Sequence, residues 1–178
     1  GSKNFGEISI VRHTSEGVDL ISPQPQHDIY SIEDLAFLIQ ALMAENPGAD
    51  IEVKLVSDVD VDLIALGAFK AGARTVIIAG DGGGTGAAKG SAIYNTGLPW
   101  EYGISTTHTL LTDLGLRNNV KLVASGHIRN EDDIVRAVLC GADSVEIGTA
   151  ALGTVGGVML EQGHLQKKIT VQQILDKL

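Results

Sequence analysis

The stretch Ile77-Ile78-Ala79-Gly80-Asp81-Gly82-Gly83-Gly84-Thr85-Gly86 decides the fold of this chain. It predicts a short buried strand that ends abruptly in a loop with almost no side chains, because a β-branched run is followed directly by glycines. Such a loop lets a flat or phosphorylated ligand approach the backbone N–H groups closely. A glycine-rich turn can also simply be tight, so this stretch alone does not establish a ligand site.

The same pattern recurs further along the chain. Residues 72–80 and residues 141–149 both consist of a helix end, Gly-Ala, a β-branched run and a glycine. We expect strands at 51–56, 76–79, 120–124 and 145–147. We expect residues 1–30 to be irregular. We expect helices from Ser31, from about Asp60 to Ala71, from about Thr106 to Leu114 and from Asn130, with residues 150–178 mostly helical and a final helix from about Val171. Strands that alternate with helices predict a parallel sheet with right-handed crossovers.

Four βα units are half of the eight that a TIM (β/α)8 barrel contains. We therefore predict an α/β fold in which residues 1–178 form one half-barrel domain. A half barrel exposes two apolar sheet edges, so we expect it to pair with a second copy as a homodimer. The alternative is an open doubly wound sheet, which the same hydrophobic pattern fits.

Composition excludes several classes of function. The chain has 178 residues, 44% of them hydrophobic, and a formal net charge of −9. It has no Lys/Arg-rich run, so we expect no nucleic-acid partner. No apolar run approaches the roughly 18 residues that span a membrane, and we expect no membrane partner. The single cysteine, Cys140, cannot form an intrachain disulfide, which suits a cytoplasmic protein. We interpret Gly1-Ser2 as an expression remnant.

Several segments together resemble the FMN-binding (β/α)8 synthase domain of glutamate synthase. They include Arg12-His13-Thr14, residues 20–23 and 27–35, Val53-Lys54-Leu55-Val56-Ser57, residues 81–87, Gly97-Leu98-Pro99-Trp100-Glu101 and Gly148-Thr149-Ala150-Ala151-Leu152. The resemblance runs from about residue 7 to residue 165. It implies the C-terminal half of that barrel, strands five to eight with the helix before them, without the amidotransferase domain that releases ammonia.

The resemblance implies an oxidoreductase function and a catalytic residue. In the family, FMN reduces 2-iminoglutarate, formed from 2-oxoglutarate and ammonia, to L-glutamate. Lys54 would lie beside the flavin and bind the carboxylate of the 2-oxo or 2-imino acid. It lies near the C-terminal end of a predicted barrel strand, where active-site residues of this fold emerge. A lysine inside an apolar run also needs a polar partner.

Two groups of residues are candidates for holding the cofactor. Loops that follow the last two barrel strands commonly bind phosphate, which makes Gly126, His127, Gly148 and Thr149 candidates for the FMN phosphate. The glycine-rich loop could contact the flavin through backbone amides, namely at Gly82, Gly83, Gly84, Thr85 and Gly86. Tight βα turns would explain the same glycines without any ligand. The five histidines have no spacing typical of a metal site, and we expect no metal.

The chain also departs from the family pattern. The family has three cysteines that hold an iron–sulfur cluster, and the aligned positions here are Gly157, Gly163 and Lys168. We therefore expect no iron–sulfur cluster. Glu131 stands where the family places a glycine at the flavin-phosphate helix, and its carboxylate would repel a phosphate. These departures suggest an engineered or reconstructed half barrel, or a natural divergent homologue.

Three functions follow from the sequence. The first is a glutamate-synthase-like oxidoreductase domain that retains at most part of the flavin-phosphate site and is inactive in isolation. The second is a structural half-barrel module without catalysis. The third is a module that binds a small phosphorylated ligand at Gly126 and Gly148 but takes up no flavin.

Overall fold

The computed structural model describes residues 5–11, 13–18, 29–82, 95–148 and 167–170. The chain divides into two units, residues 1–26 with 84–96 and residues 27–83 with 97–178. The first unit contains the short helix α1 (Glu7–Val11), where the sequence predicted only irregular structure. The prediction of one domain over residues 1–178 stays a prediction.

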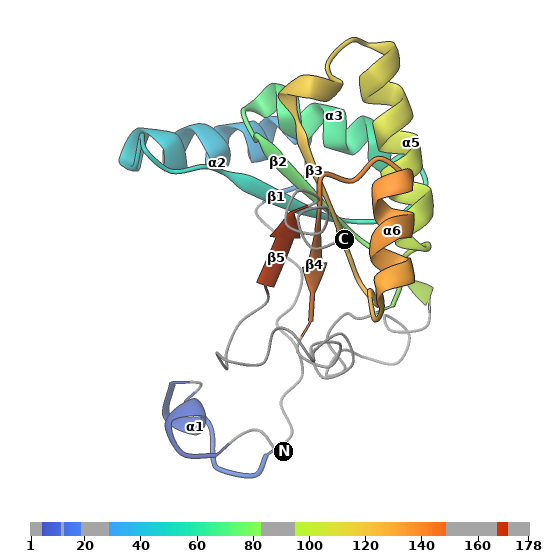
Figure 1. Ribbon diagram of the computed structural model, residues 1–178. Coiled ribbons are helices and arrows are strands. Elements are labelled where there is room, and N and C mark those ends of the chain that lie inside the picture. Colours follow the sequence, from blue (N-terminus) through green and yellow to red (C-terminus); the bar gives the residue numbers. More distant parts are fainter. Residues whose placement is uncertain (1–4, 12, 19–28, 83–94, 149–166, 171–178) are drawn as a thin grey trace. The chain divides into compact units, whose positions relative to one another are not determined.

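The second unit contains one sheet of five strands (Figure 1). Strands β1 (Glu52–Val56), β2 (Thr75–Ala79), β3 (Lys121–Ser125) and β4 (Ser144–Ile147) are parallel and lie side by side in chain order. All four predicted strands are confirmed to within one residue at each end. Their β-branched runs suit strands that are buried on both faces.

Residues 150–178 were predicted to be mostly helical, and strand β5 (Lys167–Thr170) shows that this prediction is wrong for these four residues. Strand β5 pairs antiparallel with β4, with Val145 opposite Ile169. The β-branched pair Ile169-Thr170 favours a strand, and the free edge of β4 offers it backbone hydrogen bonds. The final helix that was expected from about Val171 lies outside the described residues.

Four longer helices accompany the sheet: α2 (Ile32–Glu45), α3 (Val61–Ala71), α5 (Trp100–Asp113) and α6 (Glu131–Leu139). A short 3-10 helix, η1 (Arg117–Asn119), precedes β3. Among the described residues no helix is long and apolar enough to cross a membrane.

Three of the predicted helix starts are confirmed. Helix α3 begins at Val61, directly after the predicted start at Asp60, and side chains cap the other two. Ser31 and Asp34 form a capping box at the start of α2, in which each side chain accepts the other residue's backbone N–H. The Asn130 side chain caps α6 by accepting the N–H of Asp133 at 2.9 Å. These caps occupy N–H groups that a helix end otherwise leaves free.

Helix α5 begins at Trp100, six residues before the predicted start at Thr106. Pro99 precedes it with a φ of −52°, a fixed backbone angle that suits entry into a helix. Trp100, Ile104 and Leu111 are buried on one face of α5. Packing of this face, rather than the propensity of a Gly-, Ser- and Thr-containing segment, therefore fixes the helix start.

One face of the sheet packs against the helices. Alternate strand residues such as Val76, Ile78 and Leu122 share a buried cluster with residues of α2, α3, α5 and α6. The opposite face, here called the interior face, carries the other alternate residues: Lys54, Ile77, Ala79, Val123, Ser125, Ser144 and Glu146. A doubly wound sheet has helices on both faces and a reversal of strand order. Among the described residues the sheet has neither. The predicted α/β fold with four parallel strands in one sheet is therefore confirmed, and the described part favours the half barrel over the doubly wound alternative.

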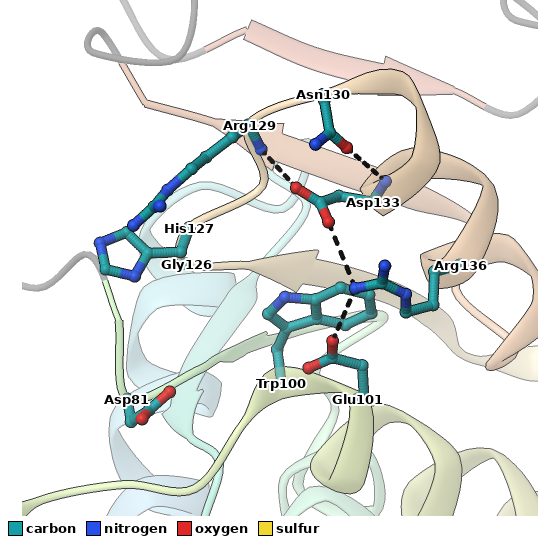
Figure 2. A pocket seen from close by; sticks show the side chains of 9 residues that line it. All are labelled: Asp81, Trp100, Glu101, Gly126, His127, Arg129, Asn130, Asp133 and Arg136. Atoms are coloured by element: carbon teal, nitrogen blue, oxygen red, sulfur yellow. Dashed lines mark hydrogen bonds and ion pairs between the residues drawn. The ribbon is translucent and has the colours of Figure 1, made fainter.

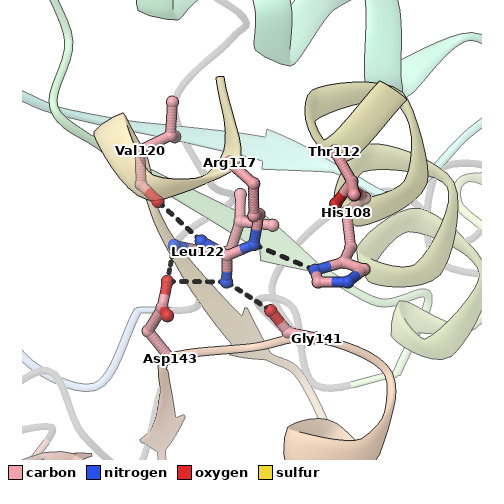
Figure 3. A network of polar contacts seen from close by, with 7 residues as sticks. All are labelled: His108, Thr112, Arg117, Val120, Leu122, Gly141 and Asp143. Carbon is pink, nitrogen blue, oxygen red and sulfur yellow. Dashed lines mark hydrogen bonds and ion pairs between the residues drawn. The ribbon is translucent and has the colours of Figure 1, made fainter. Parts of the chain in front are cut away.

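A polar network joins the N-terminal ends of β3 and β4 to α5 (Figure 3). The Arg117 guanidinium donates to His108 Nδ1 at 2.9 Å and to the carbonyls of Val120 at 2.8 Å and Gly141 at 2.6 Å. It also pairs with Asp143 at 2.9 Å. In barrel folds the N-terminal ends of the strands serve stability, and the Arg117 network joins its elements at this end.

Candidate functional site

The interior face carries an ion pair between the first and fourth strands. Lys54 Nζ on β1 lies 2.5 Å from Glu146 Oε2 on β4. The Glu146 side chain is 8% exposed and the Lys54 side chain is 45% exposed. The expectation that a lysine in this strand needs a partner is therefore confirmed. Glu146 was not predicted as a site residue, although its single charge between the apolar residues Val145 and Ile147 is a signal in the sequence.

The ion pair also shows that the sheet is curved. Two strands separate β1 from β4, so in a flat sheet their backbones would be about 14 Å apart at a strand spacing of about 4.8 Å. Glu146 is in register with Val56 rather than with Lys54, which adds about 7 Å along the strands. Side chains that stand perpendicular to a flat sheet do not bridge this distance. The interior face must therefore be concave.

Glu146 belongs to the residues near the C-terminal ends of the strands. It shares a register with Val56, Ala79 and Ser125, each the last residue of its strand. Lys54 lies two residues before Val56 on β1, and its long side chain reaches toward the C-terminal end of the sheet to contact Glu146. The ion pair thus lies at the end of the sheet where barrel enzymes bind substrates.

Ser144 adds a hydroxyl to the same face. It lies two residues before Glu146 on β4, so both side chains point to the interior face. Ser144 is 1% exposed, and its Oγ has no hydrogen-bond partner among the described residues. A buried hydroxyl without a partner costs free energy. It is therefore a group that a ligand could satisfy.

The predicted glycine sites at the ends of β2 and β3 pack against each other. A Cβ on Gly126, where φ is +93°, would lie 2.5 Å from the carbonyl oxygen of Gly82. A Cβ on Gly82 would lie 1.8 Å from Nδ1 of His127. The structure thus brings Gly82, Gly126 and His127 together. Close contact between the two loops explains both glycines without a ligand, as the tight-turn interpretation proposed.

Gly148 differs from those glycines. It follows the last residue of β4, and no atom of the described residues lies within 4 Å of a Cβ built on it. Packing among the described residues therefore gives no reason for a glycine here, and the position has room for a ligand group. The predicted partners Gly83, Gly84, Thr85, Gly86 and Thr149 lie outside the described residues.

A pocket of about 370 Å³ opens beside the ends of β2 and β3 (Figure 2). Its lining includes Asp81, Gly126, His127 and Arg129 from the loops, Trp100, Glu101, Asn130 and Asp133 from two helix starts, and Arg136 from the last turn of α6. Most of its charges already have partners. Arg136 pairs with Glu101 and Asp133, each at 3.3 Å, and Asp133 accepts the N–H of Arg129 at 2.9 Å.

The start of α6 is a poor anion site, because one of its N–H groups is capped and its first turn is acidic. The side chain of Asn130 occupies one of its free N–H groups. Glu131, Asp132 and Asp133 place three acidic residues in its first turn. A phosphate at this helix start would meet carboxylates instead of open amides. Of the predicted phosphate residues that the structure describes, Gly148 fits such a group better than Gly126.

Comparison with known proteins identifies the family. A family profile described as "Conserved region in glutamate synthase" matches residues 1–170. The chain belongs to the glutamate synthase family. It is 47% identical over 159 residues to the glutamate synthase [NADH] of Saccharomyces cerevisiae, covering 89% of this chain and 7% of that protein. It is 48% identical over 164 residues to the glutamate synthase [NADPH] large chain of Azospirillum brasilense, covering 92% of this chain and 11% of that one.

The chain thus spans about a tenth of the length of these glutamate synthases. Among solved structures, it resembles a crystal structure of GMP reductase C318A from Trypanosoma brucei. The TM-score is 0.51 at 22% sequence identity, covering 68% of this chain and 26% of the reductase. This similarity supports the TIM-barrel-like fold alone.

Proposed function

We propose that this chain is the part of a glutamate-synthase-like oxidoreductase barrel that holds the phosphate end of FMN and the carboxylate of the substrate. The observation that carries the proposal is Lys54, because it lies on the concave interior face and its ammonium reaches the level of the C-terminal strand ends. Membership of the glutamate synthase family supports the same assignment. The substrate class is a 2-oxo or 2-imino dicarboxylic acid.

The residues around β4 fit FMN in part. The open space that the described residues leave at Gly148 would admit the phosphate, and Thr149 is the next residue in the sequence. Gly126 and Gly82 are closed by their mutual contact, and we assign them to packing around the site. When bound, FMN supplies hydride transfer between the flavin and the carbon of the imino acid. Lys54 would hold the carboxylate of that acid in place.

The supply of electrons would differ from that of the family. The chain has one cysteine, and Cys140 is half-buried at the C-terminal end of α6. A cysteine-ligated iron–sulfur cluster needs several thiolates. We therefore propose that reducing equivalents reach the flavin of this chain from outside, or that the chain binds flavin without turnover.

The missing half of the barrel would come from further strands. Among the described residues β1 has a strand partner on one side only, and α2 exposes Phe37, Leu38, Leu42 and Met43. Edge strands and apolar patches of this kind pair with other elements. A second copy of the chain in a homodimer is the occupant that we propose. Strand β5 pairs with the outer edge of β4. Closing a barrel of eight parallel strands would therefore require β4 to exchange β5 for β1 of the second copy.

A flavin fluorescence titration tests the proposed function. FMN is added to the purified chain, and riboflavin, which lacks the phosphate, serves as the matched ligand. The proposal predicts tighter binding of FMN than of riboflavin, with competition by inorganic phosphate. Competition by phosphate without any flavin binding would favour the phosphate-binding module instead. No binding of either flavin would contradict the proposed function.

A non-catalytic module is the second candidate, and one contact favours it. The Lys54 ammonium already forms an ion pair with Glu146, so it is not free to bind the carboxylate of a substrate. Under this candidate, FMN-loaded chain would give no L-glutamate from 2-oxoglutarate, ammonia and a chemical reductant. Measurable L-glutamate, lost in Lys54→Gln, would exclude it.

A further inference from the structure

The contact between Lys54 and Glu146 gives the interior face a pair of opposite charges instead of a single cation. The carboxylate is 8% exposed, and the two atoms are 2.5 Å apart. A charge buried to this degree is poorly screened by water. A ligand that approaches Lys54 therefore also meets the negative charge of Glu146.

We infer that Glu146 determines substrate specificity and makes the site select acids with a cationic nitrogen next to the carboxylate. These are 2-imino and 2-amino acids, as opposed to 2-oxo acids. The ligand carboxylate would contact the Lys54 ammonium, and the cationic nitrogen would contact the Glu146 carboxylate. This inference rests on the proposed function, because it takes the interior face as the substrate side.

Electrostatics gives the reason for the selection. A 2-oxo acid offers only negative charge and oxygen acceptors. Its carboxylate and that of Glu146 would both contact the single ammonium of Lys54 and would repel each other. Like charges at one site are unfavourable. An iminium or ammonium nitrogen next to the carboxylate turns this repulsion into attraction. The hydroxyl of Ser144, buried on the same face without a partner among the described residues, adds a donor or acceptor for such a ligand.

The test compares two ligands that differ only in this group. Binding of L-glutamate and of 2-oxoglutarate to the purified chain is measured by isothermal titration calorimetry. The wild-type chain is expected to favour L-glutamate. Glu146→Gln keeps the shape of the side chain and removes its charge, so it should shift the ratio of the two dissociation constants toward 2-oxoglutarate. A charge-assisted hydrogen bond predicts a shift of about tenfold to a hundredfold.

Two further variants make the result specific. Glu45→Gln removes the same charge from an exposed position on α2, and the ratio should stay within about twofold of the wild-type value, because distant surface charges are screened. Lys54→Gln should weaken both ligands. If Glu146→Gln fails to fold, Lys54→Gln still tests the pair, and unchanged affinity for both ligands would overturn the inference.

The remaining outcomes separate this inference from the proposed function. An equal ligand ratio in the wild type and in Glu146→Gln overturns the inference, and so does an absence of binding of both ligands to both proteins at millimolar concentration. Failure of FMN to bind, together with a ratio that shifts as expected, would instead overturn the flavin assignment and leave the role of Glu146 supported.

Discussion

Replacing Arg117 by methionine should destabilise the fold more than any other arginine substitution among the described residues. The Arg117 side chain is 17% exposed, and its guanidinium donates to two backbone carbonyls and to His108. Methionine fills similar space but donates no hydrogen bond. The carbonyls of Val120 and Gly141 would lose their charged donor, and Asp143 would lose its cation.

The magnitude follows from these contacts. A hydrogen bond to a charged group contributes about 1.5–3 kcal/mol, and contributions within one network are not additive. The ion pair adds little, because the Asp143 side chain is 41% exposed. We therefore expect the free energy of unfolding to fall by about 3–4 kcal/mol, which corresponds to roughly 10 °C in melting temperature for a chain of this size.

Urea denaturation followed by circular dichroism measures this change. Arg74→Met is the matched control, because the side chains of Arg74 and of its partner Asp50 are 76% and 78% exposed and their charged atoms are 4.0 Å apart. The control should change stability by less than about 0.5 kcal/mol. Arg117→Lys keeps the charge but lacks the planar guanidinium group. Its loss of stability should lie between those of Arg117→Met and Arg74→Met. Equal effects of Arg117→Met and Arg74→Met would refute the account of the network.

Three further substitutions test other parts of the account by the same denaturation assay. Gly126→Ala should cost about 2 kcal/mol or more, because φ is +93° and the new Cβ would lie 2.5 Å from a carbonyl oxygen. Gly148→Ala should leave stability unchanged, because the space around it is open; a loss comparable to that of Gly126→Ala would contradict the assignment of open space. Asn130→Ala should cost about 1 kcal/mol by removing the cap of α6, and a neutral result would mean that water replaces the cap.

Local patterns in the sequence were sufficient to predict the four parallel strands and the starts of α2, α3 and α6. Short β-branched runs bounded by glycine predict buried strands. The side chains of Ser31 and Asn130 each accept the backbone N–H of the residue three positions later, so these helix caps depend on nearby sequence alone. The start of α5 and the strand β5 were predicted wrongly. Both depend on tertiary partners, the packing of Trp100 in one case and the edge of β4 in the other.

The candidate site could be predicted only in part. Lys54 was identified through a family resemblance, and its need for a partner followed from its apolar surroundings. The partner itself is 92 residues away in the sequence, and only the curvature of the sheet brings Glu146 within reach. The glycines after β3 and β4 look alike in the sequence, but close contacts with Gly82 and Gly80 distinguish Gly126 from Gly148.

Size-exclusion chromatography with light scattering and flavin absorbance tests the central claim most directly. The purified chain is saturated with FMN before it is loaded, and absorbance at flavin wavelengths is recorded across the peak. The account predicts flavin that co-elutes with the protein at the mass of a dimer. A peak without flavin absorbance would contradict the claim that this part of the barrel holds FMN, and a monomer mass would contradict the homodimer.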